Sequence, residues 1–146
     1  MVSVLTHKGP LPPGLSPVSE VRRSGVHLGM NWAVVSGVKN LPNCNGYLRL
    51  PINHPRRKDA DIFCNYEAFD DLEAHGGITY VRDGWIGFDT AHVGDCWPHM
   101  EFHGMLCITC RPEPRKKRVE HKTLWDEALV VEHVFDLCQR LSLEML

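Results

Sequence analysis

The stretch Ile78-Thr-Tyr-Val81, Arg82-Asp-Gly84, Trp85-Ile-Gly-Phe88 decides the predicted fold. Two runs rich in β-branched and aromatic residues flank a short loop that ends in glycine, which is the pattern of a β-hairpin. Two further strands are expected upstream, at residues 27–36 and 47–50, and Pro51 ends the second of them. The sheet is therefore expected to be small and mostly antiparallel.

The C-terminal segment 123–144 has the pattern of an amphipathic helix. Thr123 is a suitable N-cap, and Asp126 and Glu127 place negative charge in the first turn. Apolar residues recur at helical spacing and form a face broad enough to dock on a sheet. The expected fold class is α+β, a small mostly antiparallel sheet with the C-terminal helix packed on one face. Four prolines and two glycines within residues 9–17 predict an extended proline-rich arm over residues 1–25, followed by a single domain over 26–146.

Composition narrows the class of protein. The chain has 146 residues, of which 43% are hydrophobic and 23% charged, and its net charge is −2. No apolar run reaches the roughly 18–20 residues of a membrane span, and the balanced charge argues against general nucleic-acid binding. The N-terminus lacks the pattern of a secretory signal peptide. A cytosolic setting is therefore expected, with the six cysteines as free thiols, metal ligands or buried side chains rather than disulfides.

The densest polar chemistry lies between residues 75 and 95. Antiparallel pairing of the hairpin would bring His75 back toward the segment that holds Asp89 and His92, with Asp95 close behind. Two imidazoles and two carboxylates can carry general acid–base chemistry, one His as base, the other as acid, and an Asp orienting a ring. The candidate catalytic residues are His75, Asp89, His92 and Asp95, and the candidate ligand-binding residues are Tyr47, Arg49, Gly76, Gly77 and Thr79.

Structural roles remain open for the same residues, since Gly-Gly is a common turn and a buried His is commonly a core residue. Other clusters have two interpretations as well. His99, His103, Cys107 and Cys110 could bind zinc, although their spacing is not that of a standard finger. The basic run 111–122 and the acidic run 59–73 could each bind a partner or form a solvated surface.

Four segments resemble a family of small, largely uncharacterised bacteriophage and prophage proteins. They are Cys44-Asn-Gly-Tyr-Leu-Arg-Leu-Pro51, His54-Pro55, His75-Gly-Gly-Ile-Thr-Tyr80 and Trp85-Ile-Gly-Phe-Asp-Thr-Ala-His-Val-Gly-Asp95. The similarity covers residues 44–95 well and the C-terminal helix loosely. It implies a phage-type accessory protein in the cytoplasm of a bacterial host, and it brings no established activity with it.

Together these features predict a protein that binds a small phosphate-containing ligand, and hydrolysis of that ligand by His/Asp acid–base chemistry is the leading but open interpretation of the site. The phage setting suggests a nucleotide-type signal of host defence as that ligand. A non-enzymatic inhibitor of a host defence protein, acting through the acidic or the basic run, is the alternative. A third possibility is that the His/Asp cluster is purely structural. The sequence identifies no cofactor.

Overall fold

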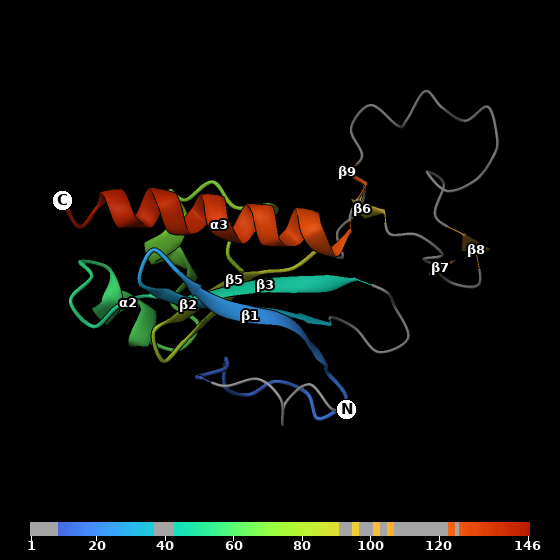
Figure 1. Cartoon of the computed structure of the whole chain (residues 1–146), viewed down its shortest axis with the longest axis horizontal. Coiled ribbons are helices and arrows are strands. Elements are labelled where there is room, and N and C mark those ends of the chain that lie inside the picture. The colour runs from blue at the N-terminus through green and yellow to red at the C-terminus, as the bar shows by residue number, and fades with distance from the viewer. Residues whose placement is uncertain are drawn as a thin grey trace.

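A five-stranded antiparallel sheet forms the centre of the fold. The computed structural model describes residues 9–36, 43–90, 95–96, 101–102, 105–106, 123–124 and 126–146. The strand order is β1-β2-β3-β5-β4, and every neighbouring pair is antiparallel. The helix α3 (Glu127–Leu143) lies across one face of this sheet and contacts β2 and β3 (Figure 1). The predicted α+β class, with the C-terminal helix on one face, is confirmed.

The remaining elements are short. The strands of the central sheet are β1 (Val21–His27), β2 (Met30–Ser36), β3 (Cys44–Arg49), β4 (Tyr80–Arg82) and β5 (Trp85–Phe88). Between β3 and β4 lie α2 (Arg57–Asp61) and the 3-10 turn η1 (Tyr66–Phe69). Two small pairs follow β5: β6 (Asp95–Cys96) runs parallel to β9 (Thr123–Leu124), and β7 (Glu101–Phe102) antiparallel to β8 (Met105–Leu106). Within the described ranges, no helix has both the length and the apolar character needed to cross a bilayer.

The predicted hairpin is confirmed as β4 and β5. Tyr80 is opposite Gly87 and Arg82 is opposite Trp85, so the connecting turn consists of Asp83 and Gly84. Both turn residues have positive φ, 49° and 85°. A two-residue turn with positive φ at both positions matches the right-handed twist of the strands, and Asp-Gly is a favoured sequence for it.

Two predicted boundaries are wrong. The expected arm over residues 1–25 includes most of β1, an edge strand that pairs with β2 through a turn at Leu28 and Gly29. Leu28 has a φ of 52°, which is unusual for a residue with a Cβ, so the sequence carried little signal for this turn. The helix begins at Glu127 rather than at Thr123, because the side chain of Asp126 accepts the hydrogen bond from the backbone N–H of Leu129 at 2.7 Å.

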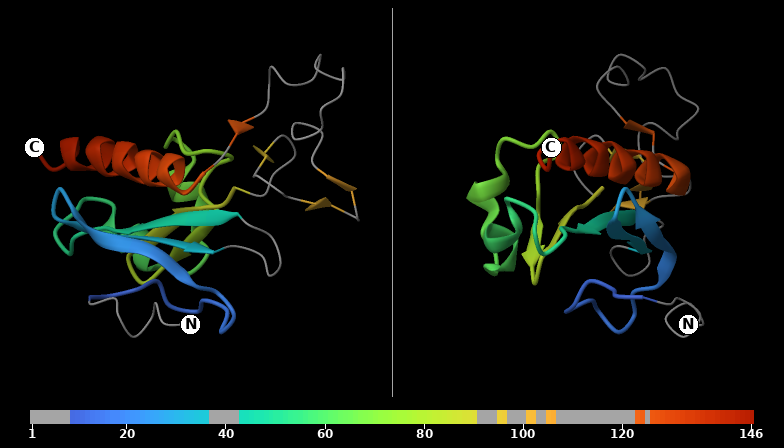
Figure 2. Two further views of the ribbon diagram at one scale, coloured as in Figure 1. Left: turned by 45° about the vertical axis from the view of Figure 1, so that its right-hand side comes forward. Right: turned by 60° about the vertical axis from the view of Figure 1, so that its left-hand side comes forward.

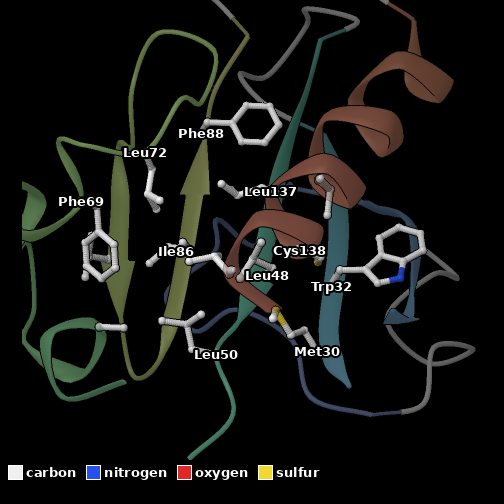
Figure 3. Close-up of a cluster of buried hydrophobic side chains, with 14 of the residues drawn as sticks. Met30, Trp32, Leu48, Leu50, Phe69, Leu72, Ile86, Phe88, Leu137 and Cys138 are labelled. Atoms are coloured by element: carbon white, nitrogen blue, oxygen red, sulfur yellow. The ribbon is translucent and has the colours of Figure 1, made fainter. Parts of the chain in front are cut away.

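Apolar side chains fill both faces of the sheet. The larger core lies between the sheet and α3, where Leu48, Ile86 and Leu137 are almost fully buried (Figure 3). A smaller core on the opposite face consists of Val21, Ala33, Val35, Tyr47 and Trp85. Leu11 and Leu15 of the N-terminal arm pack against this second core, and Figure 2 shows the arm running along the side of the sheet away from α3. The sheet is thus the middle layer of three.

The C-terminal end of α3 is held by the loop before α2. His54, which is only 4% exposed, donates from Nε2 to the carbonyl of Leu141 at 2.8 Å and accepts the backbone N–H of Arg56 on Nδ1 at 3.0 Å. The guanidinium of Arg56 bonds the carboxylates of Asp71 and Glu144. These contacts fix where the helix lies over the sheet, and hence which side chains of α3 meet β5.

Candidate functional site

A pocket of about 400 Å³ opens between α3 and the segment that leads into β4. Two kinds of element supply its walls. Glu73, Ala74 and His75 come from the segment before β4, and Phe88 from the end of β5. His133, Asp136 and Arg140 come from α3. The three helix residues are spaced i, i+3 and i+7, which places them on one side of the helix. Titratable side chains from distant parts of the chain therefore share one cavity.

Two histidines face each other across this pocket. The ring of His75 stands edge-on to the ring of His133, with centroids 6.3 Å apart and an angle of 83° between the planes. Phe88 lies 6.2 Å from His133 and forms the apolar floor beside it. Burial lowers the pKa of His133 below its ordinary 6.5, and the positive charge of His75 lowers it further. Asp136 and Glu132 oppose this shift. His133 is accordingly neutral near neutral pH, with a ring nitrogen able to take a proton.

Arg140 supplies positive charge to the same pocket. Its Nη2 donates to the backbone carbonyl of Glu73, and its Nη1 lies 3.6 Å from a carboxylate oxygen of that residue. The Glu73 side chain is 92% exposed, so water screens this ion pair strongly. The backbone contact holds the guanidinium in place, while the weak ion pair leaves it able to bind a competing anion. The pocket therefore combines two imidazoles and one cation with the carboxylates of Glu73 and Asp136.

The four candidate catalytic residues lie at different places in the structure. His75 lines the pocket, and its catalytic role stays a prediction. Asp89 is half-buried and does not line this pocket, because side chains alternate along β5 and Phe88 already points toward α3. The pKa of Tyr47 on the opposite face is raised by burial and, to a smaller extent, by the charge of Asp89. His92 lies outside the described residues, as does the side chain of Asp95, whose backbone is in β6.

The glycines after His75 form a turn. Gly76 and Gly77 have φ values of 66° and 84°, and the N–H of Gly77 bonds the carbonyl of Ala74 at 2.9 Å. This geometry requires glycine for conformational reasons, which is the structural alternative that the sequence left open. The exposed Thr79 adds one backbone hydrogen bond to the pairing of β4 with β5, since its N–H donates to the carbonyl of Gly87 at 2.9 Å. The turn therefore directs His75 toward α3.

Tyr47 and Arg49 lie on the face of the sheet away from α3. The ring of Tyr47 meets Tyr80 edge-on at 5.0 Å in the second core. Arg49, two residues further along β3, is on the same face and donates from Nε to the carbonyl of Asp83 at 3.3 Å. It lines a separate pocket of about 200 Å³ together with Arg57. These two predicted ligand-binding residues are thus not brought together with His75.

The other predicted clusters add little to this site. His99, His103, Cys107 and Cys110 lie outside the described residues, as does the basic run 111–122. Where side chains are described, no group of three or more His, Cys, Asp or Glu is arranged to hold a metal ion. In the acidic run, Asp61, Asp71 and Glu73 form ion pairs with arginines of the fold. Half of its six carboxylates therefore already have partners. Cys44, Cys64 and Cys138 are free thiols.

Sequence reasoning missed the helix side of the pocket. His133, Asp136 and Arg140 could have been found as a polar row along one edge of the predicted apolar face, at spacings of three and four residues. What the sequence could not supply was the packing of that row against residues 73–75, about sixty positions earlier in the chain. Scans of the chain against protein-family models, against curated proteins and against solved structures found no match.

Proposed function

We propose that this chain binds a small phosphate-containing ligand in the pocket between His75 and His133 and hydrolyses its phosphoester bond. The observation that carries the proposal is the meeting of two imidazoles and one guanidinium around a single pocket of about 400 Å³. That volume lies in the range of about 300–1,000 Å³ typical of small-molecule sites, and it suits a ligand of mononucleotide size.

The two rings are suited to opposite roles. A neutral imidazole can accept a proton and a protonated imidazole can donate one, so the proposal assigns the base role to His133 and the acid role to His75. In the proposed step, neutral His133 takes a proton from water while the water oxygen forms a bond to phosphorus. The bond between phosphorus and the leaving oxygen breaks, and protonated His75 gives its proton to that oxygen. Arg140 binds the phosphoryl oxygens, and Asp136 supports the charge that develops on His133.

The class of ligand is supported by two lines of reasoning. Arg140 favours an anionic ligand, because its guanidinium can bind phosphate oxygens. The nucleotide-type identity and the phage-type setting depend on the resemblance of residues 44–95 and form part of the proposal. In that setting the substrate is a nucleotide-type signal of host defence. An inhibitor that acts only through surface charge is less well supported, because Asp61 and Asp71 of the acidic run form ion pairs within the fold.

The test is incubation of the full chain with a panel of nucleotides and cyclic nucleotides, with products identified by mass spectrometry. His75→Ala and His133→Ala should each slow hydrolysis by about 10²–10⁴-fold, the usual contribution of a general acid or base. His27→Ala is the matched control. His27 also packs against α3, where its ring stacks on Phe135 at 4.0 Å, but it does not line the pocket. This variant should keep full activity.

Three outcomes would contradict the proposal. One is the absence of any product from the whole panel. Another is equal loss in all three histidine variants, which would point to general destabilisation. The third is the recovery of unchanged nucleotide after denaturation, which would indicate a protein that only sequesters its ligand. Urea unfolding of each variant separates loss of chemistry from loss of fold.

A further inference from the structure

The face of the sheet away from α3 carries an aromatic surface that the proposed function does not use. We define this aromatic face by Tyr47 on β3, Tyr80 on β4 and Trp85 on β5. The rings of Tyr47 and Tyr80 meet edge-on at 5.0 Å, and Trp85 is 1% exposed. The N-terminal arm, residues 9–20, covers this face, as the blue trace beneath the sheet in Figure 1 shows.

The arm is held mainly by its side chains. Leu11 and Leu15 pack against the aromatic face, and Pro12 between them is buried. The hydroxyl of Tyr80 donates to the backbone carbonyl of Pro13. Gly14 follows with a φ of 74°, and the guanidinium of Arg82 fills the space that a side chain would need there. The segment Leu11-Pro-Pro-Gly-Leu15 therefore fits this surface residue by residue.

The arm does not join the sheet as a strand. Within the described part of the chain, no backbone hydrogen bond links residues 9–18 to the sheet, and the first such contact is the N–H of Ser36 donating to the carbonyl of Glu20 at 2.8 Å. The arm is held by Leu11 and Leu15 on the second core and by one hydroxyl bonded to the carbonyl of Pro13, where the chain turns at Pro13 and Gly14. Proline also lowers the entropy lost on docking, because its φ is already fixed.

We propose that the aromatic face is a recognition site for a proline-rich segment of the type Leu-Pro-Pro-Gly-Leu, and that the chain's own arm occupies it until a partner polypeptide with such a segment displaces the arm. Release of residues 9–18 would break none of the hydrogen bonds between strands. The partner's segment would then make the same kind of side-chain contacts with the aromatic face that the arm made before. Because the arm is tethered to the sheet, its effective concentration at the aromatic face is high, and this concentration determines the affinity that a partner needs to displace it.

The experiment uses the full chain with a protease site inserted between Val18 and Ser19, cut only after folding. Val18 is 58% exposed, so a protease can reach this position. The cut arm should leave on dilution while near-UV circular dichroism of the rest of the chain persists. A fluorescent peptide with the sequence of residues 9–18 should then bind, as should one that keeps only Leu-Pro-Pro-Gly-Leu with altered flanks. A scrambled peptide should not.

Tyr80→Phe tests the central contact. Loss of its hydrogen bond should weaken peptide binding by about five- to ten-fold. Tyr66→Phe is the matched control, because Tyr66 bonds the thiol of Cys64 away from the arm, and it should leave binding unchanged. Unfolding of the cut protein once the arm leaves would overturn the proposal, since the arm would then be part of the core. Equal binding of the scrambled peptide would also overturn it. Dimers of uncut chain that disappear on cutting would assign the site to a second copy's arm instead of a partner.

Discussion

The glycine Gly46 on β3 leaves no room for a Cβ beneath α3, and replacing it tests how the helix is placed. A Cβ built on Gly46 would lie 2.6 Å from Cγ2 of Val134 and 2.8 Å from Cζ of Phe88. Both neighbours are almost fully buried, at 0% and 2% exposure, so neither can move into solvent. Overpacking of a tight core typically costs about 1–3 kcal/mol. Because two neighbouring side chains would lie within 3 Å of the new Cβ, Gly46→Ala should lower the free energy of unfolding by about 3 kcal/mol, the upper end of that range.

A double-mutant cycle isolates this contact. Val134→Ala alone should cost about 2 kcal/mol through the lost methyl groups and the cavity. In the double variant the missing methyls make room for the new Cβ. Its loss of unfolding free energy should therefore be at least about 1 kcal/mol smaller than the sum of the losses in the two single variants. Urea unfolding followed by circular dichroism gives all four free energies. Gly25→Ala is the control and should cost less, because Gly25 is exposed on the edge strand β1 and a Cβ there would lie 3.2 Å from its nearest neighbour, Nε1 of Trp32.

If the loss in the double variant equals the sum of the two single losses within about 0.5 kcal/mol, the reasoning is refuted, because Val134 of α3 would then not pack against Gly46. The contact also bears on the site. Phe88 lines the pocket and Val134 is the neighbour of His133, so a displaced helix would separate the two histidines. Gly46→Ala should therefore weaken ligand binding as well, and Gly25→Ala should not.

Three further predictions concern groups whose contacts are well defined. His54→Ala leaves the backbone N–H of Arg56 without its partner, while the carbonyl of Leu141 keeps the N–H of Glu144, and it should lower the free energy of unfolding by about 1–3 kcal/mol in urea titrations. Arg56 holds the pKa of Asp71 below 3.8, so Arg56→Met should raise it, as followed by carboxyl carbon NMR. The pKa of His133 is lowered from 6.5, so His75→Gln should raise it toward that value. Because unfolded His133 binds a proton more readily than folded His133, the free energy of unfolding should fall as pH drops from 6.5 toward the lower pKa of the folded state. His133→Gln should reduce this pH dependence, as measured by unfolding at several pH values.

Local signals in the sequence were sufficient for the hairpin and the helix. Asp83-Gly84 between two β-rich runs defines its own turn, because both residues tolerate positive φ. The apolar spacing of residues 127–143 defines a helix whose buried face includes Val130, Val134 and Leu137. In each case the signal and the structure concern the same few neighbouring residues, so no knowledge of the distant chain is needed.

Long-range packing decided what the sequence could not. β1 has exposed polar residues and a turn at Leu28, and it exists because β2 offers it a paired edge. His133 gave no local motif, and its role follows from the docking of α3 beside His75. Asp89 was expected beside His75, but it follows the end of β5 and is not among the residues that line the pocket with His75 and Phe88.

The central claim is that the pocket between His75 and His133 binds phosphate. Titration of the full chain with inorganic phosphate, followed by NMR of the histidine ring nitrogens, tests it most directly. We expect the resonances of His75 and His133 to shift together with one dissociation constant, while those of His27 and His54 stay in place. Arg140→Gln should weaken that binding by about ten-fold, the loss of one charge-assisted hydrogen bond. Unchanged His75 and His133 resonances at saturating phosphate, or equal shifts at His27, would contradict the account.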